Sequence, residues 1–202
     1  KHAKREIKTS RVEPISIKPF EEASKNFATL VSGQAATRYS GTQTIETTIV
    51  SPTKYTSNDT TRGGGVRTYN LKKSSTLSAG VDFEDNDNNW TAAEHNNANF
   101  DNAALDAHLG VENTYDYFFT TCGRNSYNGL GTLLKSYVHY GSNYENAGWT
   151  GAEMVYGDGA STFNPLTSFD VTAHELGHGV CSSSEALIYS RESGALNEGF
   201  SD

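Results

Sequence analysis

Two histidines separated by three residues constrain the local fold of this chain more than any other feature. Residues 174–178 read HELGH, with Glu175 directly after the first histidine. On an α-helix, side chains four residues apart lie on one face, with their Cβ atoms about 5–6 Å apart. His174 and His178 can then reach one tetrahedral Zn²⁺ ion, while Glu175 flanks the ion and can take a proton from water. The motif therefore predicts a helix that carries a zinc site.

A third metal ligand is expected at Glu198, twenty residues after His178. Catalytic zinc sites commonly have three protein ligands and an open fourth position, and two histidines with one glutamate are a standard set. Asp202 follows Glu198 by four residues, so both carboxylates share one face of a helix. Because a metal-bound histidine usually donates its second ring N–H to a carboxylate or carbonyl, Asp202 is expected to orient His174 through Nδ1. The structural alternative is a pair of satisfied core histidines and a pair of surface carboxylates.

The remaining pattern predicts an α+β fold. Residues 42–50, 66–69, 133–140 and 152–156 read as strands, and apolar side chains at three- and four-residue steps predict a helix over 101–120. The sequence TSFD at 167–170 has the form of a capping box, so the HELGH helix is expected to run from about residue 168 to about residue 182. His108 lacks a second histidine four residues later and is expected to lie in the core or to support a metal ligand from behind. His139 is expected to be structural as well.

The chain resembles the thermolysin family of zinc metallopeptidases (gluzincins, or neutral proteases). The similarity rests on VTAHELGHGV at 171–180, ESGALNEGFSD at 192–202 and NAGWTGAEMVYGDG at 146–159, and it extends in unbroken order over 35–202. The resemblance implies a β-rich thermolysin-like domain with one long helix and the HELGH helix. It also implies a secreted, zinc-dependent endopeptidase that is made as a zymogen and acts on polypeptides.

Several further site residues follow from the resemblance alone. It implies that Asn146 and Ala147 on an edge strand bind the substrate main chain by strand addition. It implies that Glu175 is the catalytic base and that Tyr189 hydrogen-bonds the developing oxyanion. Asn197 also matches a family position near the site. One departure is Gly148, where the family usually has an aromatic residue, so the substrate preference is open.

Calcium is a second metal that the resemblance implies. Its sites would fall on Asp85 and Asp87 and on Asp170, which is also expected to cap the HELGH helix. The first pair does not belong to an EF-hand loop, because Trp90 stands where that loop needs glycine and Asn96 where it needs glutamate. A solvated turn is the more usual explanation of the same residues.

Composition narrows the classes of partner. The formal net charge of −8 argues against nucleic acid, which needs patches of lysine and arginine. No run approaches the ~18 apolar residues of a membrane helix, so no membrane partner is expected. A signal peptide is expected to have been removed or to lie outside this sequence. Cys122 and Cys181 form no CxxC motif, and a disulfide between them stays open.

The chain is expected to divide at residue 34. Residues 1–34 have a basic start and two prolines, which suits a leader, a remnant of a pro-region, a surface strap or a disordered terminus, and residues 35–202 are expected to form the N-terminal catalytic domain. The family's mostly helical C-terminal domain is expected to be absent from this chain and to be supplied in cis or as a second chain. Two functions are therefore open: an endopeptidase, or a non-catalytic zinc-binding fragment. The chain alone is expected to be inactive.

Overall fold

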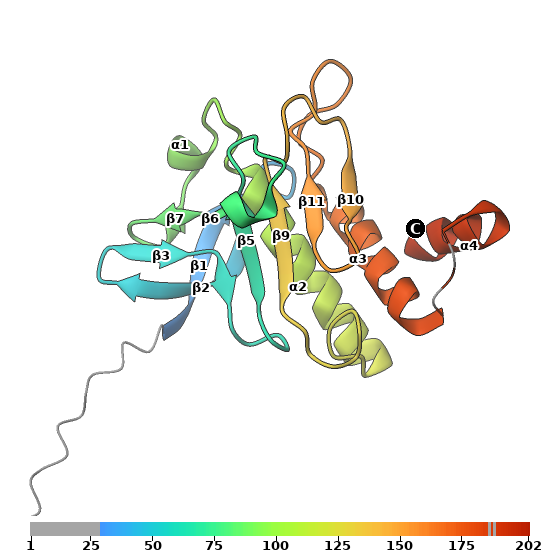
Figure 1. The fold of residues 1–202 in the computed structure, drawn as a ribbon. Helices are drawn as coiled ribbons and strands as arrows, with labels where there is room; N and C mark the ends of the chain where they lie inside the picture. The colour runs from blue at the N-terminus through green and yellow to red at the C-terminus, as the bar shows by residue number, and fades with distance from the viewer. Residues whose placement is uncertain (1–28, 186, 188) are drawn as a thin grey trace, which may run out of the picture.

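A computed structural model describes residues 29–185, 187 and 189–202. In this part of the chain the strands gather on one side, a long helix runs behind them, and the two last helices lie on the other side (Figure 1). The helices are α1 (Ala92–His95), α2 (Ala103–Cys122), α3 (Phe169–Glu185) and α4 (Arg191–Ser201), with a short 3₁₀ turn at Leu77–Ala79. None of the described helices is long and apolar enough to cross a membrane.

The described strands form two sheets. They are β1 (Thr29–Ala36), β2 (Thr42–Ser51), β3 (Lys54–Thr56), β4 (Asn58–Asp59), β5 (Val66–Asn70), β6 (Val81–Asp82), β7 (Glu84–Asp85), β8 (Asn89–Trp90), β9 (Leu134–Val138), β10 (Ala147–Trp149) and β11 (Met154–Tyr156). The first sheet has the order β7-β3-β2-β1-β8 and the second β10-β11-β9-β5-β4, with β6 beside β5. β10 pairs antiparallel with β11 and lies at the edge of the second sheet.

The long helix α2 forms the centre of the core. It packs against β2, β5 and β9 on one side and against α3 on the other. Small side chains in its first half allow this close packing, since Ala103, Ala104 and Ala107 are wholly buried. Gly123 adopts the left-handed conformation at the C-cap, with φ of 63°, and ends the helix.

The predicted mixture of helices and strands is confirmed. The helix predicted at 101–120 is α2, and the HELGH helix is α3. The strands predicted at 42–50, 66–69, 133–140 and 152–156 correspond to β2, β5, β9 and β11. The bounds differ by a few residues, mostly because the short strands stop where their ladder partners stop.

One sequence prediction about an element end is wrong, and one boundary expected from the sequence falls inside a strand. The division at residue 34 falls inside β1, which pairs with β2 from Thr29 to Ala36, so residues 29–34 belong to the first sheet. Residues 1–28 lie outside the described part of the chain. The capping box at 167–170 does not form, because α3 begins one residue later than the motif requires. The Thr167 hydroxyl is buried and has no hydrogen-bond partner among the described residues, and Asp170 accepts a hydrogen bond from Ser168 Oγ at 2.5 Å.

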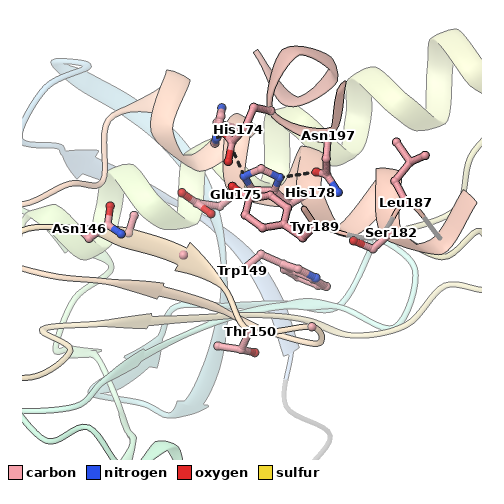
Figure 2. Close-up of a pocket in the computed structure, with 14 residues that line it drawn as sticks. Asn146, Trp149, Thr150, His174, Glu175, His178, Ser182, Leu187, Tyr189 and Asn197 are labelled. Atoms are coloured by element: carbon pink, nitrogen blue, oxygen red, sulfur yellow. Dashed lines mark hydrogen bonds and ion pairs between the residues drawn. The ribbon is translucent and has the colours of Figure 1, made fainter. Parts of the chain in front are cut away.

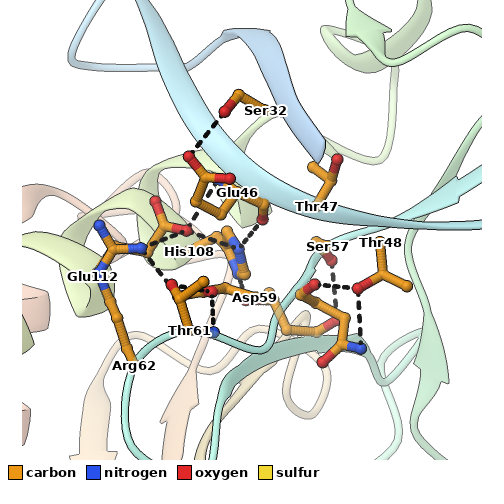
Figure 3. A network of polar contacts seen from close by, with 12 residues as sticks. Ser32, Glu46, Thr47, Thr48, Ser57, Asp59, Thr61, Arg62, His108 and Glu112 are labelled. Atoms are coloured by element: carbon orange, nitrogen blue, oxygen red, sulfur yellow. Dashed lines mark hydrogen bonds and ion pairs between the residues drawn. The ribbon is translucent and has the colours of Figure 1, made fainter. Parts of the chain in front are cut away.

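A buried polar network joins α2 to both sheets (Figure 3). The Arg62 guanidinium lies 2.8 Å from Asp59 Oδ2 and 3.3 Å from Glu112 Oε1 on α2. His108, wholly buried on α2, contacts Thr68 Oγ1 of β5 at 3.0 Å through Nδ1 and a backbone carbonyl of β2 at 2.9 Å through Nε2. His108 is therefore a core histidine, one of the two roles that the sequence left open.

The two cysteines are both free. Cys122 is exposed at the end of α2, whereas Cys181 is buried in α3. The disulfide that the sequence left open is not formed in this structure.

His139 links two loops by a pair of charged contacts. Its Nδ1 lies 2.6 Å from Asp158 Oδ1, and its Nε2 lies 3.2 Å from Asp101 Oδ1. Burial lowers the pKa of His139, but the hydrogen bonds to the two carboxylates outweigh burial and raise it to about 9. His139 is thus structural, as predicted, and holds the loop after β11 against the segment before α2.

The stability of the fold should fall as the pH rises from about 6.5 to about 9. In that window folded His139 keeps a proton that the unfolded chain, with an ordinary value of 6.5, has lost. The stabilisation is complete below 6.5, is lost above 9, and is on the order of 3 kcal/mol. Urea unfolding at a series of pH values measures it. A His139→Gln protein should be less stable at pH 6 and show a flatter profile; an unchanged slope would contradict the assignment.

Helices α2 and α3 cross closely at Gly110. A Cβ atom at this position would lie 2.8 Å from the Thr172 Cβ on α3, well inside van der Waals contact. Thr172 is wholly buried, so it has little room to move. The close crossing therefore depends on glycine at position 110, and it fixes the position of α3 relative to the core.

Gly110→Ala should destabilise the protein by about 1–3 kcal/mol, as overpacking of a core does. Without the close crossing, alanine would favour the helix interior by about 0.8–1 kcal/mol. Gly199→Ala on α4 is the matched control, because no atom of the described part of the chain lies within 4 Å of the added Cβ. The midpoints of urea unfolding compare the two variants. A Gly110→Ala protein that is as stable as the Gly199→Ala protein would show that the helices separate freely.

Candidate metal centre and cleft

Helices α3 and α4 bring three potential metal ligands to one point. His174 Nε2 lies 3.1 Å from Glu198 Oε2, and His178 Nε2 lies 3.7 Å from the same oxygen. The two imidazole rings are nearly perpendicular, with centroids 4.5 Å apart. Ligand bonds of about 2.0–2.2 Å around a tetrahedral ion separate the ligand atoms by about 3.3 Å. The residues therefore fit a zinc ion in both donor type and spacing.

The second ring nitrogen of each histidine contacts α4 or its C-cap residue, Asp202. His174 Nδ1 lies 2.8 Å from Asp202 Oδ1, and His178 Nδ1 lies 2.6 Å from Asn197 Oδ1. A carboxylate or amide oxygen can only accept, so both Nδ1 atoms carry the proton and both Nε2 lone pairs face Glu198. This tautomer is the one that binds a metal through Nε2.

Asn197 holds His178 in a way that sequence reasoning missed. It is buried, with 2% of its surface exposed, and Ser201 Oγ beside it lies 3.1 Å from His178 Nδ1. Asn197 and Ser201 are four residues apart, as Glu198 and Asp202 are. The four-residue spacing that places Glu198 and Asp202 on one face of a helix places Asn197 and Ser201 on one face too. Since each of them precedes one of the carboxylates by one residue, their face lies next to that of Glu198 and Asp202.

Glu175 lies beside the candidate metal centre and is 8% exposed. Burial raises the pKa of Glu175, while the charges of His178 and His174 and the backbone amide of Trp149 act in the opposite direction. In Figure 2 the side chains of His174, Glu175 and His178 face the cleft, and Trp149 lies across from them. A raised pKa suits a carboxylate that accepts and releases a proton near neutral pH.

A cleft of about 520 Å³ contains the candidate metal centre. Strand β10 forms one side, since Asn146, Ala147 and Gly148 line the cleft. Among the described strands β10 pairs only with β11, so its other edge is available to an extended peptide. Tyr189 lines the cleft as well, with its ring 5.9 Å from the His178 ring and most of its surface exposed.

The predicted calcium residues occupy two separate places. Asp85 is buried, and its Oδ2 accepts the backbone N–H groups of Asp87 and Asn88. Asp87 is exposed and accepts the N–H of Asn89. Asp170 is exposed in the first turn of α3, and no other carboxylate or imidazole of the described residues forms a metal-binding group with it.

Removing the side chain that contacts Nδ1 of either histidine should weaken metal binding. Asn197→Ala and Asp202→Ala should each lower zinc affinity about 10–100-fold, because the freed imidazole loses its orientation. Competition with a zinc chelator measures the affinity. Glu192→Ala is the control, since Glu192 is an exposed carboxylate of the same helix that does not line the cleft. Equal affinities in all three variants would show that the contacts are incidental.

Comparison with known proteins gives a consistent result. Residues 32–182 match the family model described as thermolysin metallopeptidase, catalytic domain. A bacillolysin of Brevibacillus brevis is 47% identical over 163 residues, which cover 80% of this chain and 29% of the relative. The transglutaminase-activating metalloprotease of Streptomyces mobaraensis is 44% identical over 178 residues, which cover 87% of this chain and 22% of the relative.

A solved structure adds the same likeness in three dimensions. The precursor of protealysin, a metalloproteinase from Serratia proteamaculans, superposes with a TM-score of 0.56 and 38% identity, over 67% of this chain and 40% of that one. The chain thus spans less than a third of the length of the curated relatives above. The family match extends over the HELGH helix and the strands that face it, and the chain belongs to the thermolysin family of metallopeptidases.

Proposed function

We propose that the protein is a secreted, zinc-dependent endopeptidase that hydrolyses peptide bonds within polypeptides. The observation that carries the proposal is the convergence of His174, His178 and Glu198 beside the buried carboxylate of Glu175, inside a cleft. Family membership supports the peptidase activity. The acidic charge of −8 supports a polypeptide substrate over nucleic acid.

The three ligands would hold one Zn²⁺ ion, which supplies a Lewis acid that polarises the scissile carbonyl and acidifies water. Glu175 takes the proton of the attacking water and delivers it to the leaving amine, so that one group serves as base and then as acid. Its burial favours this exchange, because the proton is held more firmly than by an exposed carboxylate.

Substrate binding would use the free edge of β10. An extended peptide adds to this edge by main-chain hydrogen bonds with Asn146 and Ala147. The Tyr189 hydroxyl donates to the oxygen that becomes negative as water attacks. The ring of Tyr189 near His178 supports this role, since a donor is useful only next to the reacting carbonyl.

Exposed apolar side chains on α3 and α4 support the idea that activity requires a further segment of protein. Leu196 and Phe200 of α4 are exposed to 66% and 56%, and Phe169 at the start of α3 to 48%. Exposed apolar side chains on neighbouring helices are typical of a surface that meets another polypeptide. We therefore propose that a mostly helical domain covers this side, in the same chain or as a second chain. The alternative function is a zinc-binding fragment that hydrolyses nothing until that domain is present.

Glu175→Gln should abolish hydrolysis while zinc remains bound. Loss of a general base costs about 10²–10⁴-fold in rate. The assay compares zinc content and cleavage of a quenched fluorescent peptide, for the chain alone and with the helical domain added. Glu192→Gln makes the same chemical change on an exposed surface and should change neither value. Loss of zinc in Glu175→Gln would make Glu175 a ligand, and undiminished cleavage would exclude it as the base.

A further inference from the structure

A second group of metal-binding side chains lies far from the HELGH helix. Asp85 of β7 and Glu94 and His95 of α1 place one ligand atom each within 4.8 Å of one another. In Figure 1, β7 and α1 lie at the opposite side of the molecule from α3 and α4. The group therefore shares no residue with the candidate zinc centre and requires its own explanation.

The distance between His95 and Asp85 resembles a distance in the first site. His95 Nε2 lies 3.2 Å from Asp85 Oδ1, compared with 3.1 Å between His174 Nε2 and Glu198 Oε2. Both values are close to the ~3.3 Å that separates two ligand atoms around a tetrahedral ion. A direct hydrogen bond between imidazole and carboxylate has the same length, so the surroundings must distinguish the two.

Each of the three side chains is held in place by a ring contact or by hydrogen bonds to neighbouring residues. The His95 ring stacks on the buried Trp90 ring, with centroids 5.1 Å apart. The Asp85 Oδ2 atom is occupied by two backbone N–H groups, which leaves Oδ1 for His95. The Glu94 carboxylate accepts the Thr91 hydroxyl in a capping box at the start of α1. Such outer contacts are what orients the ligands of a metal site.

Carboxylates outnumber lysine and arginine among the described residues at this place. A cavity of about 430 Å³ is lined by Glu84, Asp85, Glu94 and Asp101, with Lys54 as its only lysine or arginine among the described residues. Lys54 pairs with Glu84, and Asp101 pairs with His139. The Asp85 side chain is only 2% exposed, and within the described part of the chain its sole ion-pair partner is His95. Buried charges are usually paired or bound to a metal.

We propose that Asp85, Glu94 and His95 bind a divalent transition-metal ion of the Zn²⁺ type. The imidazole nitrogen decides the class, because Ca²⁺ takes six to eight oxygen ligands whereas Zn²⁺ accepts nitrogen and oxygen in a four-coordinate site. This proposal differs from the calcium that the resemblance implied at Asp85 and Asp87, because the ion uses His95 and leaves Asp87 in solvent. The ion ties α1 to the edge strand β7.

The test counts zinc on the full chain after removal of bound metal. Wild type should bind two Zn²⁺ ions in equilibrium dialysis, and His178→Ala should still bind one. In the His178→Ala background, Glu94→Gln should lower the affinity of the remaining ion by at least about 100-fold, more than loss of an outer contact costs. Glutamine keeps the capping box, so this variant is expected to fold. Co²⁺ in place of Zn²⁺ gives an absorption spectrum that should vanish with Glu94→Gln.

Asp87→Asn is the matched control, since it removes a carboxylate from the same loop without touching the three ligands. It should leave the affinity of the His178→Ala protein unchanged. Three results would overturn the proposal: no ion on His178→Ala, a loss of affinity with Asp87→Asn but not with Glu94→Gln, or displacement of Zn²⁺ by an equal concentration of Ca²⁺. Circular dichroism of each variant confirms that the fold is intact.

Discussion

The position of α3 is the constraint on which the rest of the site depends. Its residues Gly177 and Gly179, on either side of His178, lie against other parts of the fold: a Cβ on the first would be 2.9 Å from the Ser201 backbone of α4, and one on the second 2.9 Å from the Trp149 ring of β10. The helix is thus held between the strand that lines the cleft and the helix that carries Glu198. Close packing on both sides fixes the part of α3 that carries His178.

The elements that could be predicted are those whose signal is local. The HELGH spacing determines which side chains share a helix face, and this depends on helix geometry alone. The capping box failed for a reason that the local sequence does not contain. Thr167 is drawn into the core, where it is wholly buried, and the helix begins after it. Pairing with β2 also extends β1 across residue 34, into a segment whose own composition looked irregular.

The residues of the second proposed metal site could not be grouped from local sequence either. The family resemblance implied calcium at Asp85 and Asp87, which stand in one short Asp-x-Asp stretch. The fold instead groups Asp85 with His95, ten residues later, because a turn through β8 brings α1 back beside β7. Asn197 was missed as the partner of His178 for a different reason. Its spacing to Ser201 was readable, but asparagine carries no charge to mark it as part of a metal centre.

The arrangement of α4 has a mechanical consequence. This one helix carries the third candidate ligand, and together with its C-cap residue Asp202 it contacts Nδ1 of both histidines. An ion bound there would cross-link α3 and α4, and its site would not exist until the two helices had docked. Detaching α4 would remove Glu198 and the contacts to both histidines together. Docking of α4 and binding of the ion should therefore be cooperative. Metal binding at this centre would then indicate whether α4 is docked on α3.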